Sequence, residues 1–219
     1  MVYYHTNALP VRIDELERMI RHGDIIYLGK QTLPWIQRVV HPFLSLLLDT
    51  PFHHAGIVDR DKQLVHFIRK GYPTTLRTFA ERTSQLQIIP IKSFLQRYHM
   101  KHTPIIHILR KNDLSHPMDF QSNLLQGIHS LLKDIPSLSF ENNHLFHILN
   151  YMGWMDTWKR GRIHCNLFLG WLLQRMGYLY QEKSSHSNDF HSFLPFSLEQ
   201  RLTHESCYTS LGYFRLVEV

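Results

Sequence analysis

The chain has 219 residues, of which 43% are hydrophobic and 19% charged, a balance that excludes a disordered chain and suits one domain with a full core. The formal net charge of +6 favours anionic partners such as phospholipid headgroups or nucleic acid. Lys and Arg are scattered, without a run of five or a zinc-finger pattern, so the sequence argues against nucleic-acid binding and leaves an anionic membrane surface as a candidate partner.

Two cysteines, Cys165 and Cys207, are too few for a disulfide-rich secreted domain, and residues 1–19 contain no apolar signal core. We therefore expect an intracellular protein, cytoplasmic or peripheral to a membrane. The most apolar segment begins at Trp35 and is broken by charged residues and Pro42, so it is too short to span a bilayer. It predicts a buried helix, with a helix on a membrane surface as the alternative.

The first predicted elements alternate between helix and strand. "IDELERMIRHGD" has acidic residues early and Gly23 near its end, which predicts a helix with a glycine stop, and "DIIYLG" predicts a buried strand. "HHAGIV" and "QLVHFIR", separated by the polar "DRDK", predict a β-hairpin. "LQIIPI" and "PIIHILR" predict two more strands, and "KSFLQRYH" between them has apolar residues at helical spacing.

The second half is predicted to be mostly helical. Residues 112–162 show helical spacing with breaks at Pro136 and "SFENNH", and "HCNLFLGWLLQRMGYL" predicts an amphipathic helix that ends at Gly177. The last apolar run, "YTSLGYFRLVEV", predicts a strand that closes the sheet. Strands that cluster early with helices beside them indicate an α+β protein, and we expect one domain over residues 1–219.

Cys165 lies at the expected start of that last helix, after the basic stretch "KRGRIH". Unpaired N–H groups and the positive end of the helix dipole stabilise a thiolate there, and the cysteine's own N–H can serve an oxyanion hole. A lone cysteine is more often a small buried hydrophobe. Position alone leaves both interpretations open.

A thiol nucleophile needs a base within hydrogen-bond reach, and the base needs a group that orients it. His54 and His66 meet both needs if the hairpin forms, because residues at matching depth on adjacent strands lie side by side. His53 is a rival for the base. Neighbours in a strand face opposite sides, so only one of the two can face Cys165, and the spacing to Gly56 favours His54.

The motifs "HGDIIYLG", "HAGIV", "QLVHF" and "HCNLFLGWLLQRMG", in this order, resemble the circularly permuted NlpC/P60 group of papain-like proteins. "LQIIPIKSFLQRY" also resembles a segment of the bacterial members and of those in poxviruses and other large DNA viruses. The resemblance implies a permuted papain-like fold, in which a small antiparallel sheet packs against helices. Residues at about 112–162 match nothing in the group and would be a mostly helical insertion.

Carried over residue by residue, the resemblance implies that Gly23 and Asp24 open the first strand, His54 is the base, His66 orients it and Cys165 is the nucleophile. A histidine in the third role is typical of the lecithin:retinol acyltransferase-like branch, which transfers or hydrolyses acyl chains of phospholipids at membranes. Bacterial and poxviral members use Glu there.

The cysteine motif departs from both branches. Asn166 follows Cys165 where the acyltransferase-like branch has Asn-Cys-Glu-His and the bacterial branch often has Cys-Ser-Glu. The residues therefore support the superfamily more than either branch.

The sequence predicts a cysteine-dependent hydrolase or acyltransferase that acts on a lipid acyl ester or an amide through a Cys-His-His triad and an acyl-enzyme. The alternative is a catalytically silent structural or interaction protein of the same fold, such as a virion component. The long insertion and the altered cysteine motif support that alternative. A membrane-surface binding module is a third interpretation.

Trp154, Trp171 and Asn166 are the candidate substrate-binding residues near Cys165, although core packing is the ordinary role of tryptophan rings. We expect no cofactor, because the chain has no Gly-rich phosphate loop. We expect no metal, because the closely spaced histidine pairs have no cysteine partners at suitable spacing. Cys207 is interpreted as structural.

Overall fold

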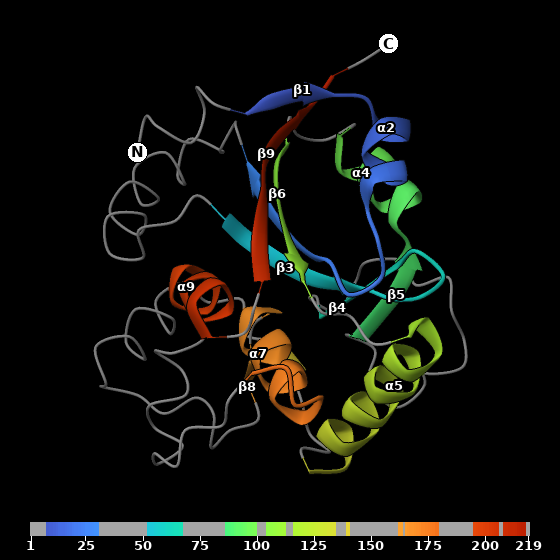
Figure 1. The fold of residues 1–219 in the computed structure, drawn as a ribbon, viewed down its shortest axis with the longest axis vertical. Coiled ribbons are helices and arrows are strands. Elements are labelled where there is room, and N and C mark those ends of the chain that lie inside the picture. Colours follow the sequence, from blue (N-terminus) through green and yellow to red (C-terminus); the bar gives the residue numbers. More distant parts are fainter. Residues whose placement is uncertain are drawn as a thin grey trace.

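The computed structural model describes residues 8–30, 52–67, 86–99, 104–112, 116–134, 139–140, 162–163, 165–179, 195–205 and 208–217. Within these ranges the protein is α+β, with five helices and a seven-stranded, mostly antiparallel open sheet (Figure 1). The helices are α2 (Ile13–Met19), α4 (Ile91–His99), α5 (Pro117–Asp134), α7 (Cys165–Arg175) and α9 (Pro195–Glu205). The strands are β1 (Leu9–Val11), β2 (Ile25–Lys30), β3 (Phe52–Val58), β4 (Gln63–Phe67), β5 (Leu86–Pro90), β6 (Pro104–Lys111), β7 (Ser139–Phe140), β8 (Arg162–Ile163) and β9 (Tyr208–Leu216).

The large sheet has the strand order β1-β9-β6-β2-β3-β4-β5. Its central strands are continuous apolar runs, as expected for strands that are covered on both faces. β1 pairs parallel with β9, and the other neighbours pair antiparallel. β7 and β8 form a separate two-stranded pair. The last strand therefore lies inside the sheet, between β1 and β6, rather than at its edge.

The predicted hairpin of β3 and β4 is confirmed. Asp59 closes its turn, because Oδ1 of the side chain accepts hydrogen bonds from the backbone N–H groups of Asp61 (2.9 Å) and Gln63 (2.8 Å). Lys62 takes a left-handed conformation in this turn, with φ of 57°. The turn fixes the register, in which Gly56 lies opposite His66.

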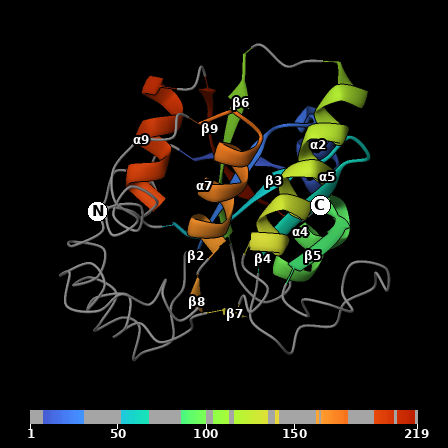
Figure 2. The same cartoon turned by 90° about the horizontal axis from the view of Figure 1, so that it is seen from below.

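Helices cover both faces of the large sheet (Figures 1 and 2). We call the two sides the α7 face and the α4 face. The α7 face carries Ile25, Tyr27, Ala55, Ile57, Val65 and Phe67, which pack with residues of α5, α7 and α9. The α4 face carries Ile26, Leu28, Val58, Leu64, Ile106 and Ile108, which pack with residues of α2 and α4. Odd and even residues of β2, β3 and β4 thus lie in different cores, as strand alternation requires.

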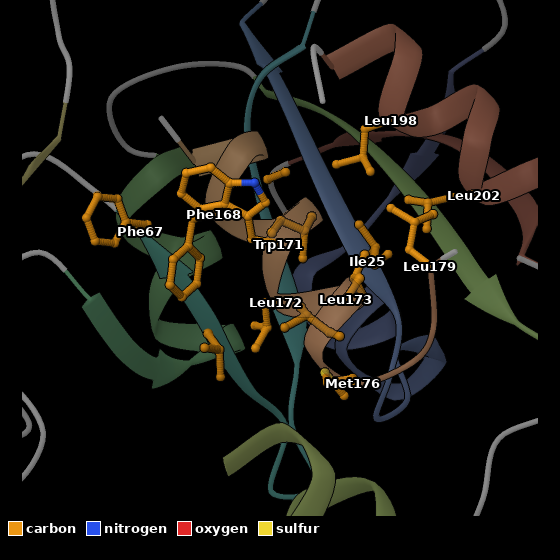
Figure 3. Packing of buried hydrophobic residues seen from close by; sticks show 14 of the residues in the cluster. Ile25, Phe67, Phe168, Trp171, Leu172, Leu173, Met176, Leu179, Leu198 and Leu202 are labelled. Atoms are coloured by element: carbon orange, nitrogen blue, oxygen red, sulfur yellow. The ribbon is translucent and has the colours of Figure 1, made fainter. Parts of the chain in front are cut away.

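Helix α7 is the centre of the larger core (Figure 3). Every residue from Cys165 to Leu173 is buried, so this helix is apolar nearly all round rather than amphipathic as predicted. The ring of Phe168 stacks on Phe67 of β4, with centroids 5.2 Å apart. The predicted glycine stop is confirmed at Gly177, whose φ is 72°.

The predicted strands and helices agree with the described elements in type and order. The first helix is shorter than predicted, since α2 ends at Met19 and Gly23 instead forms the turn into β2 with φ of 78°. In the predicted insertion, α5 is a helix, while residues 141–161 lie outside the described ranges, as does the apolar segment from Trp35. No helix in the described part of the chain is long and apolar enough to cross a bilayer.

Candidate functional site

Cys165 is the first residue of α7 and is only 3% exposed. The backbone N–H groups of Ala55, Asn166 and Cys165 itself lie near its sulfur and favour the thiolate. Two of these groups belong to the first turn of the helix, where N–H groups have no partner inside the helix, and the third comes from β3. The predicted position of the cysteine at a helix start is confirmed.

Burial has a larger effect on this thiol than the three N–H groups have. It raises the pKa of Cys165 to about 11, since removal from water penalises the thiolate. At neutral pH the resting thiol is therefore protonated, and it needs a base to become a nucleophile.

The structure brings His54 and His66 together as predicted. Nε2 of His54 lies 2.7 Å from Nδ1 of His66, and the rings meet edge to face with centroids 5.0 Å apart. Burial lowers the pKa of His54 to about 4. Burial also lowers the pKa of His66 well below its usual value, and the nearby charge of a protonated His54 lowers it further. Both rings are thus neutral near pH 7, and one donates its N–H to the other.

This imidazole pair lies on the α4 face. His54 is in register with Leu28, and the centroids of the His54 and His66 rings lie 6.2 Å and 5.1 Å from that of Phe94 in α4. Cys165 instead contacts Ala55, which lies on the α7 face. Among the described residues, neither ring is hydrogen-bonded to Cys165.

The register of β3 explains which groups the strand offers to each side. His54 pairs with Leu28 and faces α4, whereas the group of β3 that reaches Cys165 is the backbone N–H of the next residue, Ala55. The register with β2 then shifts: Leu28 pairs with His54 and Gly29 pairs with Phe52, which leaves His53 as the extra residue of a bulge. Bulges re-aim a side chain where a strict strand would not, and they are frequent beside active sites. The side chain of His53 itself lies outside the described part of the protein.

The predicted substrate-binding residues have different surroundings. Asn166 is buried beside Cys165, and its Oδ1 has no hydrogen-bond partner among the described residues. Trp171 is 7% exposed and belongs to the core with Leu172 and Leu173, so it packs the interior of the protein (Figure 3). Trp154 lies outside the described ranges.

Sequence reasoning missed a polar group on the α7 face. Tyr27, His107 and Tyr213 lie in one cross-strand row of β2, β6 and β9, and the ring of His107 is stacked between the two tyrosines. Nδ1 of His107 lies 3.4 Å from Oε1 of Glu199 in α9, and Nε2 lies 2.8 Å from Oγ of Ser210 in β9. The only signal in the sequence was a histidine inside the apolar run "PIIHILR".

Electrostatics connect this group to Cys165. Burial raises the pKa of Tyr27 well above its usual value, and nearby Glu199, Cys165 and Tyr208 act in the same direction. Burial also lowers the pKa of His107 to about 4 and raises that of Glu199 to about 7. The α7 face thus has an imidazole and a carboxyl group as well as the thiol.

Asp24, which the resemblance placed at the start of the first strand, has a structural role. Its fully buried carboxylate accepts hydrogen bonds from Nε (3.0 Å) and from an Nη of Arg110 (2.8 Å), and from the N–H of Arg21 (2.8 Å). Arg110 also donates to the carbonyl oxygen of Met19, which ties β2 and β6 to α2.

In the part of the chain that the structure describes, no three His, Cys, Asp or Glu side chains gather as they would around a metal ion. Comparisons with protein-family models and with curated proteins find no match for this chain.

Proposed function

We propose that the protein is a cysteine-dependent hydrolase or acyltransferase that acts on an ester or amide through an acyl-enzyme on Cys165. The observation that supports this most is the position of the sulfur at a helix start, with three backbone N–H groups near it. Such groups stabilise a thiolate, and donors in this position also stabilise the oxyanion that forms when the thiolate attacks a carbonyl.

His53 is the base in this proposal. It is the rival for the base that the sequence offers, and its backbone is the extra residue of the bulge, next to the His54–Ala55 peptide whose N–H reaches Cys165. His53 would take the proton of Cys165, the thiolate would attack the carbonyl carbon, and the leaving alcohol or amine would receive the proton. Water or an acceptor alcohol or amine would then release the acyl group from the thioester.

The resemblance to permuted NlpC/P60 proteins supports the same chemistry and refines the fold to a permuted papain-like one. Gly23 and Asp24 precede β2, the hairpin follows, and Cys165 begins a later helix, which is the order of motifs that the resemblance requires. It favours lipid acyl groups as substrates, and the net charge of +6 suits an anionic membrane surface.

The experiment is a search for the thioester. Wild-type protein is incubated with 4-nitrophenyl esters of short and long acyl chains and with phospholipid vesicles, and intact-protein and peptide mass spectrometry locate any added acyl group. We expect a thioester on the peptide that contains Cys165, absent from Cys165→Ala and retained in Cys207→Ala, which leaves Cys165 as the single thiol. A Cys165 peptide that stays unmodified by every donor would contradict the proposal.

A catalytically silent interaction protein, such as a virion component, is the second candidate. Two observations favour it: burial raises the pKa of Cys165 to about 11, and the His54–His66 pair lies beside Phe94 of α4 with no hydrogen bond to Cys165. The pH dependence of alkylation by iodoacetamide separates the candidates. A base next to Cys165 gives a rate that levels off near neutral pH, whereas a silent buried thiol reacts slowly up to pH 10.

A further inference from the structure

The second polar group of the α7 face is arranged as a nucleophile, a base and an orienting acid. Oγ of Ser210 lies 2.8 Å from Nε2 of His107, and Nδ1 of the same ring lies 3.4 Å from Oε1 of Glu199. An activated serine is recognised by this order of contacts: a hydroxyl at one ring nitrogen and a carboxylate at the other.

The base is held in place from several sides. His107 is 0% exposed, and its ring stacks on Tyr213 and Tyr27 with centroid distances of 4.4 Å and 6.1 Å. Because β6 is paired with β2 on one side and β9 on the other, the backbone of His107 is fixed by both neighbours. The ring therefore has one orientation, with Nε2 toward Ser210.

The nucleophile, in contrast, is accessible. Ser210 is exposed, and it lies at a bulge where Leu109 pairs with Ser210 and Ile108 pairs with Gly212. Gly212 has a φ of 108°, which favours glycine, and its N–H donates to Oγ of Ser210 over 3.1 Å. The bulge directs a hydroxyl toward a buried imidazole while the same hydroxyl remains open to solvent.

We propose that Ser210 is a second nucleophile, independent of Cys165, which accepts acyl groups from carboxylic esters at the protein surface. Oγ bonds to the ester carbonyl carbon as its proton passes to Nε2 of His107, and the proton then passes to the alkoxide as the carbon–oxygen bond breaks. Water attacks the acyl-serine by the same route and releases the acid. Glu199, whose Oε1 lies 3.4 Å from Nδ1 without a hydrogen bond between them, is a positioning residue that acts on the ring by its charge.

A fluorophosphonate probe tests this site, because such probes phosphonylate activated serines and leave unactivated hydroxyls unmodified. We expect one added group on the peptide that contains Ser210, none on Ser210→Ala, and a labelling rate at least ten times lower for His107→Gln and Glu199→Gln. Thr209→Ala is the matched control, since Thr209 is an exposed hydroxyl one residue away that bonds to Asn112. Cys165→Ala should be labelled like the wild type, which separates this site from the thiol.

A second pair of variants covers the case in which His107→Gln does not fold. Ser210→Cys and Thr209→Cys each add one thiol at neighbouring exposed positions of β9. A thiol beside His107 should react with iodoacetamide at pH 7 at least ten times faster than one at position 209. Absence of phosphonylation at Ser210 in folded protein, or equal alkylation rates for the two thiols, would overturn the proposal.

Discussion

The two faces of the sheet hold their polar groups in different ways. On the α4 face, His54 and His66 hydrogen-bond to each other beside Phe94. On the α7 face, Cys165 lies at a helix start and His107 is hydrogen-bonded to an exposed serine. The first arrangement pairs two imidazoles, whereas the second has nucleophilic atoms beside backbone donors or an imidazole.

In the proposal above, the histidine pair of the hairpin has no catalytic role. His54 and His66 hydrogen-bond to each other, and burial favours the neutral state of both rings. On this proposal the polar groups of the α4 face stabilise the fold and those of the α7 face carry the chemistry. Substitutions on the two faces should change different measurements.

The largest expected effect on stability comes from the buried ion pair that ties β2 and β6 to α2. Asp24→Asn should lower the free energy of unfolding by about 3–5 kcal/mol, because it leaves the charge of Arg110 without its buried partner. Urea denaturation measures the loss. Arg12→Ala is the control, since it removes an exposed ion pair with Glu15 and should leave the midpoint nearly unchanged.

Low pH should destabilise the folded protein mainly through the pair of His54 and His66. The folded-state pKa values of His54 and His66 are lowered, that of His54 to about 4, so the stability that the neutral rings provide is complete above the unfolded value of 6.5 and is lost as pH falls below it. In this window each ring can lower the free energy of unfolding by about 1.4 kcal/mol per pH unit. Urea titrations at pH 7 and pH 5 should show the loss, and His66→Gln should make it smaller.

The α7 face should contribute little to that acid dependence. The pKa of His107 is lowered to about 4, so this residue makes the folded protein less stable as pH falls below 6.5. The pKa of Glu199 is raised to about 7, so this residue makes the folded protein less stable as pH rises above 4.5. The two changes oppose each other over the same pH range. An equal acid sensitivity in His66→Gln and wild type would show that the α4 face does not dominate.

A smaller effect is expected from Gly56→Ala in the hairpin. The added Cβ would lie 2.8 Å from Cδ1 of Leu64, 2.9 Å from the backbone oxygen of Val65 and 3.0 Å from Cβ of His66. Crowding of this kind costs about 1–3 kcal/mol, and here the backbone oxygen cannot turn away. Thermal denaturation measures the loss. If the variant is as stable as the wild type, β3 and β4 are not packed this closely on the α4 face.

Much of the fold could be predicted from local sequence. The hairpin followed from the polar "DRDK" between apolar runs, and the end of α7 followed from Gly177, because turn chemistry and glycine stops are local signals. The contact of His54 with His66 followed from the hairpin as well.

The composition of the candidate site could not be predicted in the same way. Which face of β3 meets Cys165 depends on how a distant helix packs, and a shift of one residue exchanges His53 for His54. The bulge at His53 has no glycine or proline to mark it in the sequence. His107 was hidden for another reason: in an apolar strand, one buried histidine gives no sign of the carboxyl group and hydroxyl that reach it from α9 and β9.

The most direct test of the account compares two adjacent histidines. His53→Gln and His54→Gln, each shown to be folded by its unfolding midpoint, are measured for the rate at which iodoacetamide alkylates Cys165 at pH 7. Loss of a general base costs about 10²–10⁴ in rate. The account predicts a decrease of that size for His53→Gln and a change of less than about threefold for His54→Gln. The reverse order would contradict it, because it would make His54 the base of Cys165.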